Sequence, residues 1–168
     1  MPVVPRKMNK EDASVIDSST GKRVFDEANY YYEATMILEK ERKLDELFPP
    51  VIMNATFACE LFSKAILYSY QDTSQTREVI KGHCLKKLYD EFKDEDKSEL
   101  RHLYKGAAGS RFDEWISDID ELFETWRYRY EYKRYATHYS FVLEYMDALK
   151  KLTESIYKND NLLEKYLE

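Results

Sequence analysis

The chain has 168 residues, of which 43% are hydrophobic and 35% are charged, and its net charge at pH 7 is −6. This length is typical of one domain and the composition lies in the globular range, which excludes a chain that is disordered throughout. The acidic balance also excludes a protein that coats nucleic acid through its overall field, although a local basic patch remains open.

The breakers of secondary structure are few. Only four glycines and four prolines occur, and residues 51–81 and 110–168 contain neither. A sheet protein with many tight turns needs these residues, so their scarcity predicts an all-α fold. Residues 1–21 mix Pro, Ser, Asp and Gly, and we interpret them as an N-terminal arm that precedes a single helical domain over residues 22–168.

Two long helices are predicted in the first half of that domain. Apolar residues at spacings of three and four predict a helix over residues 22–47, which Pro49 and Pro50 are expected to end. A second helix is predicted over residues 51–70 and has the clearest core pattern. Its apolar positions recur at i, i+3 and i+4: Ile52, Ala55, Cys59, Phe62, Ile66 and Tyr70.

Shorter helices follow in the middle of the chain. A polar segment leads to Gly82 and to a short helix predicted over residues 83–92. Asp94 is expected to cap the start of another short helix that ends at Gly106. Ser110 with Asp113 three residues later has the pattern of a capping box and predicts the start of a long helix.

The end of the chain is predicted to be helical as well. Beyond Trp126 the segment YRYEYKRY alternates aromatic and polar residues, which a strand would also do, but an isolated strand would leave its backbone without partners. We therefore expect a helix there, with a break open as an alternative. A last long helix is predicted over residues 137–157, followed by an amphipathic tail to Tyr166.

Several classes of site and location are not indicated. Cys59 and Cys84 are too few for a disulfide framework, and neither the cysteines nor the histidines have zinc spacing. No Gly-rich phosphate loop occurs, so we expect no metal and no cofactor. No apolar stretch reaches the roughly 18 residues that span a bilayer, and no N-terminal run resembles a secretory signal. We expect a cytoplasmic protein that does not enter a membrane.

Three polar clusters interrupt the apolar patterns. Glu60 and Lys64 are four residues apart in FACELFSKAIL and can pair on one helix face. Gly82 allows a positive φ directly before His83, at the start of a helix. The third cluster contains Trp126, Arg127, Tyr128 and Glu131. Each cluster alone has an ordinary structural explanation, as a surface ion pair or a helix cap.

Taken in order, the segments ACELFSKAIL, GHCLKKLYDEF and FETWRYRYE resemble the HEPN (higher eukaryotes and prokaryotes nucleotide-binding) superfamily over about residues 25–150. The resemblance implies an up-and-down bundle of four to five main helices with additional short helices. It also implies a chain that commonly forms a homodimer and works in toxin–antitoxin, phage-defence or RNA-processing systems, where a partner protein is a further expectation.

Catalytic members of that superfamily share a metal-independent ribonuclease motif: an arginine, four to six residues, then a histidine. Where the resemblance places this motif, Arg134 and His138 enclose only three residues, and Arg129 and His138 enclose eight. Arg77 and His83 enclose five, but they lie earlier in the chain. A histidine moves protons near neutral pH and an arginine stabilises the phosphorane charge, so the catalytic candidates are His83, Arg77, His138 and Arg134.

The segment 126–138, WRYRYEYKRYATH, has four basic residues and one acidic residue with tyrosines between them. Basic groups bind phosphates and exposed rings stack on unpaired bases, so this segment is the best candidate for nucleic-acid binding. The alternative is that its tyrosines belong to the core or an interface. The candidate binding residues are Glu60, Lys64, Trp126, Arg127, Tyr128 and Glu131.

Two functions follow as hypotheses. The first is a HEPN-like protein that binds or cleaves RNA without metal, in a defence or toxin–antitoxin setting. The second is a non-catalytic interaction or scaffold module, or a nucleotide-binding domain. In the second hypothesis a buried polar network fixes the register of the helices, with these members: Glu60, Lys64, His83, Arg127 and Glu131.

Overall fold

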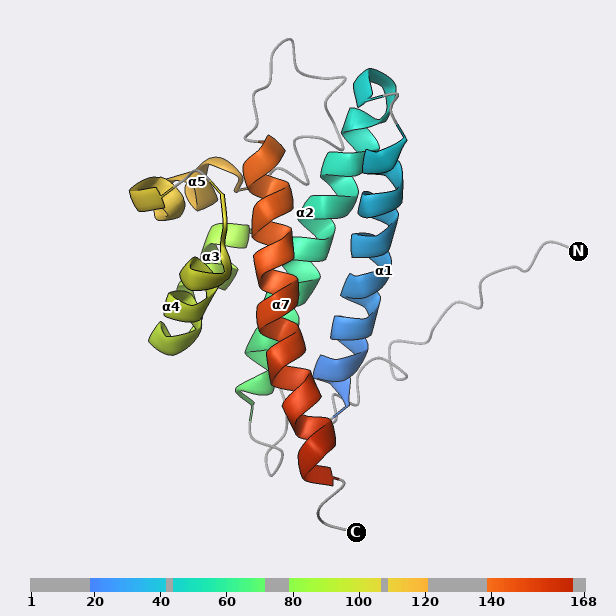
Figure 1. Cartoon of the computed structure of the whole chain (residues 1–168). Coiled ribbons are helices and arrows are strands. Elements are labelled where there is room, and N and C mark those ends of the chain that lie inside the picture. Colours follow the sequence, from blue (N-terminus) through green and yellow to red (C-terminus); the bar gives the residue numbers. More distant parts are fainter. Residues whose placement is uncertain (1–18, 42–43, 72–78, 107–108, 121–138, 165–168) are drawn as a thin grey trace, which may run out of the picture.

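The computed structural model describes residues 19–41, 44–71, 79–106, 109–120 and 139–164 (Figure 1). Within these ranges the chain forms helices and no strand, which confirms the all-α prediction. The elements are α1 (Thr20–Lys40), α2 (Leu44–Ser69), α3 (Leu85–Asp90), α4 (Asp94–Leu103), a 3₁₀ turn (Gly109–Arg111), α5 (Phe112–Asp118) and α7 (Tyr139–Glu164).

Three long helices, α1, α2 and α7, form the centre of the molecule (Figure 1). The ring of Tyr31 on α1 lies 4.5 Å from that of Phe57 on α2, and Gly21, near the start of α1, lies against Tyr68, near the end of α2. These two helices are therefore antiparallel. The Tyr157 hydroxyl near the end of α7 donates to the Ala65 carbonyl at 2.7 Å, so α7 runs in the same direction as α2.

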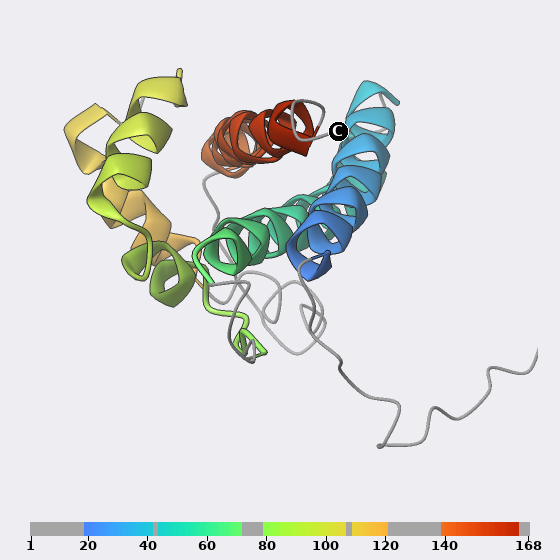
Figure 2. The same cartoon turned by 90° about the horizontal axis from the view of Figure 1, so that it is seen from below.

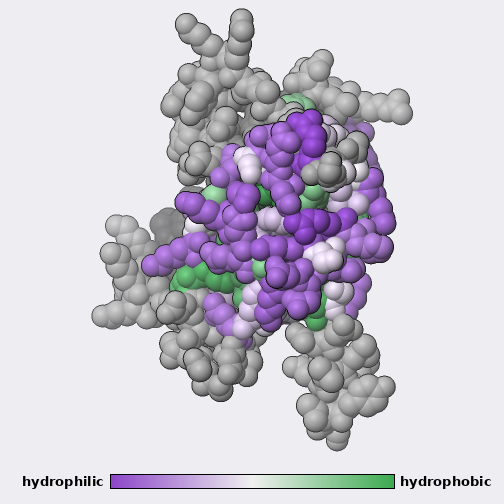
Figure 3. All heavy atoms as spheres, turned by 90° about the vertical axis from the view of Figure 1, so that its left-hand side faces the viewer, coloured by the Kyte–Doolittle hydropathy of each residue, from purple (hydrophilic) through white to green (hydrophobic). Residues whose placement is uncertain are grey.

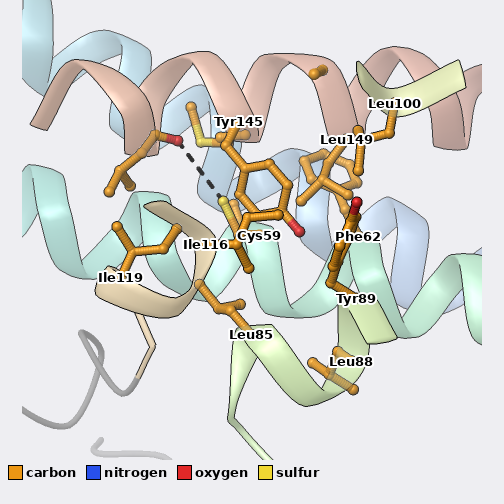
Figure 4. Packing of buried hydrophobic residues seen from close by; sticks show 14 of the residues in the cluster. Cys59, Phe62, Leu85, Leu88, Tyr89, Leu100, Ile116, Ile119, Tyr145 and Leu149 are labelled. Carbon is orange, nitrogen blue, oxygen red and sulfur yellow. Dashed lines mark hydrogen bonds between the residues drawn. The ribbon is translucent and has the colours of Figure 1, made fainter. Parts of the chain in front are cut away.

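The short helices α3, α4 and α5 pack beside α2 and α7, on the side away from α1 (Figure 2). Figure 4 shows how they close the core: Leu85 of α3 and Ile116 of α5 lie near Cys59, and Leu100 of α4 lies near Leu149. All five side chains are at most 3% exposed. Burial of this apolar area is the main stabilising contribution to such a core.

The first predicted helix ends earlier than expected. The break falls after Lys40 and not at the prolines, because Pro49 and Pro50 lie inside α2. Both prolines lie past the first turn of α2, where each removes a backbone hydrogen bond and crowds the carbonyl four residues earlier. Directly after the prolines, Val51 and Ile52 are fully buried, and this packing holds the helix through them.

Two capping predictions are wrong. Lys93 and not Asp94 is the N-cap of α4, and Asp94 begins the helix, where its charge favours the N-terminal end. Arg111 and not Ser110 is the N-cap of α5, and the Arg111 side chain makes no capping hydrogen bond. Asp113 accepts hydrogen bonds from Tyr89 and Arg101. α4 also ends at Leu103, before Gly106.

The later helices differ in extent from the predictions. α5 ends at Asp118, so the long helix predicted from residue 110 is interrupted there, and its continuation through residues 121–138 lies outside the described part of the chain. α7 continues to Glu164, past the predicted end at Tyr157. α3 is shorter than predicted and begins after its N-cap, Cys84.

Residues 47–69 of α2 are long and apolar enough to cross a membrane by length and composition, contrary to the sequence expectation. In this fold 72% of the 18-residue window that meets this test is buried within the protein. A helix that is apolar on most sides is also what the centre of a bundle requires.

Gly21 lies in the first turn of α1, inside the predicted arm. It is buried, and a Cβ at this position would overlap the Tyr157 hydroxyl and lie 3.1 Å from Cβ of Tyr68. The absence of a side chain therefore lets the start of α1 approach both α2 and α7. The arm boundary predicted at residue 21 falls within this helix.

Candidate functional site

The centre of the candidate site is a buried carboxylate on α2. Glu60 is 2% exposed, and its Oε1 accepts a hydrogen bond of 2.7 Å from Nζ of Lys64 one turn later. The Lys64 side chain is 14% exposed. A buried charge is tolerated only when it is paired and hydrogen-bonded, so this ion pair is part of the interior and unlike an ordinary surface pair.

A short segment before α3 brings a third residue to this pair. The backbone N–H of Ile80 donates to the Tyr68 hydroxyl at 3.1 Å, near the end of α2. Three residues later, Nδ1 of His83 lies 2.9 Å from Oε1 of Glu60. Residues 79–84 therefore run back along α2, and Gly82, with a φ of 101°, takes the left-handed conformation that glycine adopts without strain.

The contact with Glu60 fixes the orientation of the His83 ring. A carboxylate can only accept hydrogen bonds, so Nδ1 carries the proton and donates it to Glu60. In the neutral ring, Nε2 then keeps its lone pair. The His83 side chain is 61% exposed, although the carboxylate that holds it is buried. An oriented imidazole with an outward nitrogen is the arrangement that a general base requires.

The second carboxylate oxygen of Glu60 has a different environment. Oε2 is buried and has no hydrogen-bond partner among the described residues, while Oε1 accepts from both Lys64 and His83. Such an oxygen has the capacity for one more donor. Arg127, which the network hypothesis includes as a member, lies outside the described residues.

Cys84, next to His83, has a structural role. Its thiol accepts from the N–H of Lys87 at 3.3 Å and donates to Oδ2 of Asp120 at 3.0 Å. Burial, together with the hydrogen bond to Asp120, raises the pKa of the Cys84 thiol. Because the thiolate is the nucleophilic form, this environment disfavours a Cys–His nucleophilic pair. Asp120 instead ties the end of α5 to the start of α3.

Lysines flank His83 in the sequence. The segment 81–87 contains three lysines and no acidic residue, in a chain with a net charge of −6. Lys81 and Lys87 are exposed, and Lys86 pairs with Asp90 one turn later. Figure 3 shows the side of the molecule that carries α3, α4 and α5, where hydrophilic residues cover most of the described surface. This segment is a local basic region.

The other predicted site residues lie outside the described part of the chain. Arg77, Arg134 and His138 lie outside the described residues, as do Trp126, Arg127, Tyr128 and Glu131. His102 is exposed in the last turn of α4, and no hydrogen bond of the described residues links its side chain to Glu60. The structure brings together three of the residues predicted from the sequence: Glu60, Lys64 and His83.

Sequence reasoning also missed residues that position the site. Tyr68 anchors the segment 79–84 through its hydroxyl, and Asp120 holds the start of α3. No sequence pattern identified Tyr68 as an anchor, because a tyrosine near the end of an apolar helix pattern is equally well explained as a core residue. Asp120 is one of 32 acidic residues, and its spacing from Cys84 follows no motif.

Within the described ranges, no three His, Cys, Asp or Glu side chains gather as metal ligands. Comparison of the sequence with protein-family models, with curated proteins and with solved structures gives no match.

Proposed function

We propose that this protein binds RNA at the surface around His83 and cleaves it without a metal ion, with His83 as the group that transfers protons. The observation that carries the proposal is the 2.9 Å contact between Nδ1 of the exposed His83 and the buried Glu60 carboxylate. This contact leaves Nε2 as the outward proton acceptor.

The chemistry assigned to His83 is attack by the ribose 2′-hydroxyl on the adjacent phosphate. Nε2 accepts the 2′-OH proton while the 2′-oxygen bonds to phosphorus and the bond to the 5′-oxygen breaks. The products are a 2′,3′-cyclic phosphate and a 5′-hydroxyl. The leaving 5′-oxygen takes a proton from a second acid, for which His138 is the sequence candidate. Cations near the phosphate stabilise the developing charge.

RNA binding is assigned to the lysines beside His83. Lys81 and Lys87 are exposed, and neither has an acidic neighbour within the segment 81–87. Each phosphate contact releases counterions, so binding should weaken steeply as salt increases. Charge reversal at Lys81 and Lys87 should lower the affinity for a fluorescent single-stranded RNA. Reversal at Lys158, 73% exposed near the end of α7, is the control and should change it little.

We also infer that the helices belong to a HEPN-like bundle and that the protein acts in a defence or toxin–antitoxin setting. The support is the order of the three motif segments, together with the meeting of the first two at Glu60 and His83. Cleavage should therefore be assayed with structured RNA, such as transfer RNA, and with unstructured RNA.

Cleavage is tested with a conservative pair of variants. In His83→Asn the amide nitrogen occupies the position of Nδ1 and still donates to Glu60, but no group remains at Nε2. His102→Asn is the matched control, since His102 is an exposed histidine on α4. With EDTA present, the wild type and His102→Asn should cleave RNA to 2′,3′-cyclic phosphate ends, and His83→Asn should be slower by about 10²-fold or more.

Equal rates for His83→Asn and the wild type would remove His83 from the reaction. Absence of RNA cleavage by the wild type under all conditions would contradict the proposed activity and favour the second candidate function.

The second candidate function is a non-catalytic interaction module, or a nucleotide-binding domain, and one observation favours it. Glu60 and Lys64 are 2% and 14% exposed, as expected of a pair that fixes helix register.

A further inference from the structure

Two donors share one oxygen of the buried carboxylate. Nζ of Lys64 lies 2.7 Å from Oε1 of Glu60, and Nδ1 of His83 lies 2.9 Å from the same atom. The two nitrogens are therefore within about 6 Å of each other, beside a carboxylate that is 2% exposed, and charges at this distance interact strongly where water is largely excluded. The protonation of His83 thus depends on the charge of Lys64.

The balance of charge decides which state of His83 this group of three favours. Glu60 carries one negative charge, and among the described residues Lys64 is the only lysine or arginine that pairs with it. With Lys64 present, a neutral imidazole leaves the group without net charge. Without Lys64, the same balance requires a proton on His83. A buried carboxylate is costly unless a cation compensates it, so the lysine removes the need for a charged ring.

Other titratable groups lie near His83, and within the described ranges none of them pairs with Glu60. The Asp120 carboxylate of α5 accepts hydrogen bonds at the start of α3, from the Cys84 thiol and the Lys86 N–H. The Tyr68 hydroxyl of α2 accepts from Ile80. The segment of His83 itself carries three lysines: Lys81, Lys86 and Lys87. Water screens these lysines more than it screens Lys64, which is 14% exposed.

We propose that Lys64 is a positioning residue for His83: its charge balances Glu60, so that the carboxylate orients the imidazole as a neutral ring. Nε2 then keeps the lone pair with which it accepts the proton of a ribose hydroxyl. In a pair of histidine and carboxylate without such a lysine, the carboxylate favours the charged ring. The role of Lys64 in cleavage rests on the proposed function of His83, whereas its effect on the protonation of His83 does not.

Nitrogen-15 NMR against pH measures the protonation of His83 without any substrate. Lys64→Met should move the midpoint of the His83 titration to higher pH by about 1, because Glu60 then favours the charged ring. Glu60→Gln keeps an oxygen acceptor without the charge, and it should move the midpoint to lower pH by a similar amount. The double variant Glu60→Gln/Lys64→Met removes both charges and should titrate within about 0.3 of the wild type.

Two controls separate the charge of Lys64 from proximity and from damage to the fold. Lys64→Arg keeps the charge and should titrate as the wild type does. Lys86→Met removes a lysine that lies three residues from His83 and pairs with Asp90, so the midpoint should move by less than about 0.3. If Lys64→Met does not fold, the double variant still decides, because it should titrate at lower pH than the wild type if Lys64 has no influence on His83.

The pH dependence of RNA cleavage gives a second readout. A lysine that only stabilises the fold would lower the rate by the same factor at every pH. Loss of the proposed charge balance should instead move the acidic limb of the pH–rate profile to higher pH. On that limb Lys64→Met should be about tenfold slower than the wild type, and near pH 9 the two rates should converge.

Three results would overturn the proposal. The first is a folded Lys64→Met variant whose His83 titrates as in the wild type. The second is a double variant that titrates well below the wild type, and the third is a cleavage rate that Lys64→Met lowers by the same factor at every pH. If the wild type cleaves no RNA, the proposed function is lost, and the titrations still decide whether Lys64 sets the protonation of His83.

Discussion

Two ion pairs of this protein have the same spacing and opposite surroundings. Glu60 and Lys64 on α2 are four residues apart, and so are Lys150 and Glu154 on α7. The carboxylate of Glu60 is 2% exposed and has a second partner, His83, from a different segment. Glu154 is 26% exposed and has a second partner, Lys158, from its own helix. The spacing alone does not distinguish a structural site from a solvated helix face.

The largest expected effect comes from removing the cation of each pair. Lys64→Met leaves the buried Glu60 with only His83, and the free energy of unfolding should fall by about 3 kcal/mol. Lys150→Met removes a partner of a carboxylate that water reaches, and the loss should stay below about 1 kcal/mol. Urea unfolding at pH 7 measures both. Equal losses would mean that burial does not separate the two pairs.

Removing both partners of the buried pair sharpens the same comparison. Glu60→Met together with Lys64→Met replaces the ion pair by apolar side chains of similar length. Buried ion pairs are often close to neutral against such replacements, so the double variant should recover most of the stability lost in Lys64→Met, to within about 1 kcal/mol of the wild type. A double variant less stable than Lys64→Met would show that the Glu60–His83 contact contributes most of the stability.

A cross-helix hydrogen bond gives an intermediate effect. The Tyr32 hydroxyl on α1 donates to Asp147 on α7 at 2.7 Å, so Tyr32→Phe should reduce the free energy of unfolding by about 1 kcal/mol. Tyr30→Phe is the matched control on the same helix, since the Tyr30 side chain is 69% exposed. Urea unfolding at low protein concentration should show no change for it. Similar losses in both variants would contradict the assignment of this bond.

The smallest expected effect is a change in how stability depends on pH. Hydrogen bonding to Lys150, together with Lys158, lowers the pKa of Glu154, and donation from Tyr32 and Lys151 lowers the pKa of Asp147 against the opposing effect of burial. A lowered pKa means that the unfolded chain binds more protons, so this stability is present above the unfolded pKa of about 4 and is lost as the pH falls below it. Between pH 6 and pH 3, the melting temperature should fall less steeply for Glu154→Gln than for the wild type.

Periodicity predicted the buried sides of the long helices well. Cys59, Phe62 and Ile66 on α2 were placed inward from their spacing, and all three are fully buried. The ends of helices were predicted less well, because they depend on tertiary contacts. Pro49 and Pro50 lie within α2, where the burial of Val51 and Ile52 outweighs the local preference of proline to end a helix.

The candidate site was predictable only in part. Its three polar residues were recognisable because charged side chains and a Gly-His pair interrupt apolar patterns. The contact between His83 and Glu60 was not predictable. The hydrogen bond from Ile80 to Tyr68 positions the segment that carries His83, and no residue spacing encodes that bond. The burial of Glu60 likewise depends on packing against segments that lie far away in the chain.

The orientation of the His83 ring tests the central claim most directly. Nitrogen-15 NMR of the histidines at pH 8, where imidazole is neutral, distinguishes a proton on Nδ1 from one on Nε2. His83 should carry the proton on Nδ1 in the wild type, and Glu60→Leu, which removes the acceptor, should shift the proton toward Nε2. A wild-type His83 with its proton on Nε2, unchanged in Glu60→Leu, would show that Glu60 does not hold this ring and that Nε2 is not free to accept a proton.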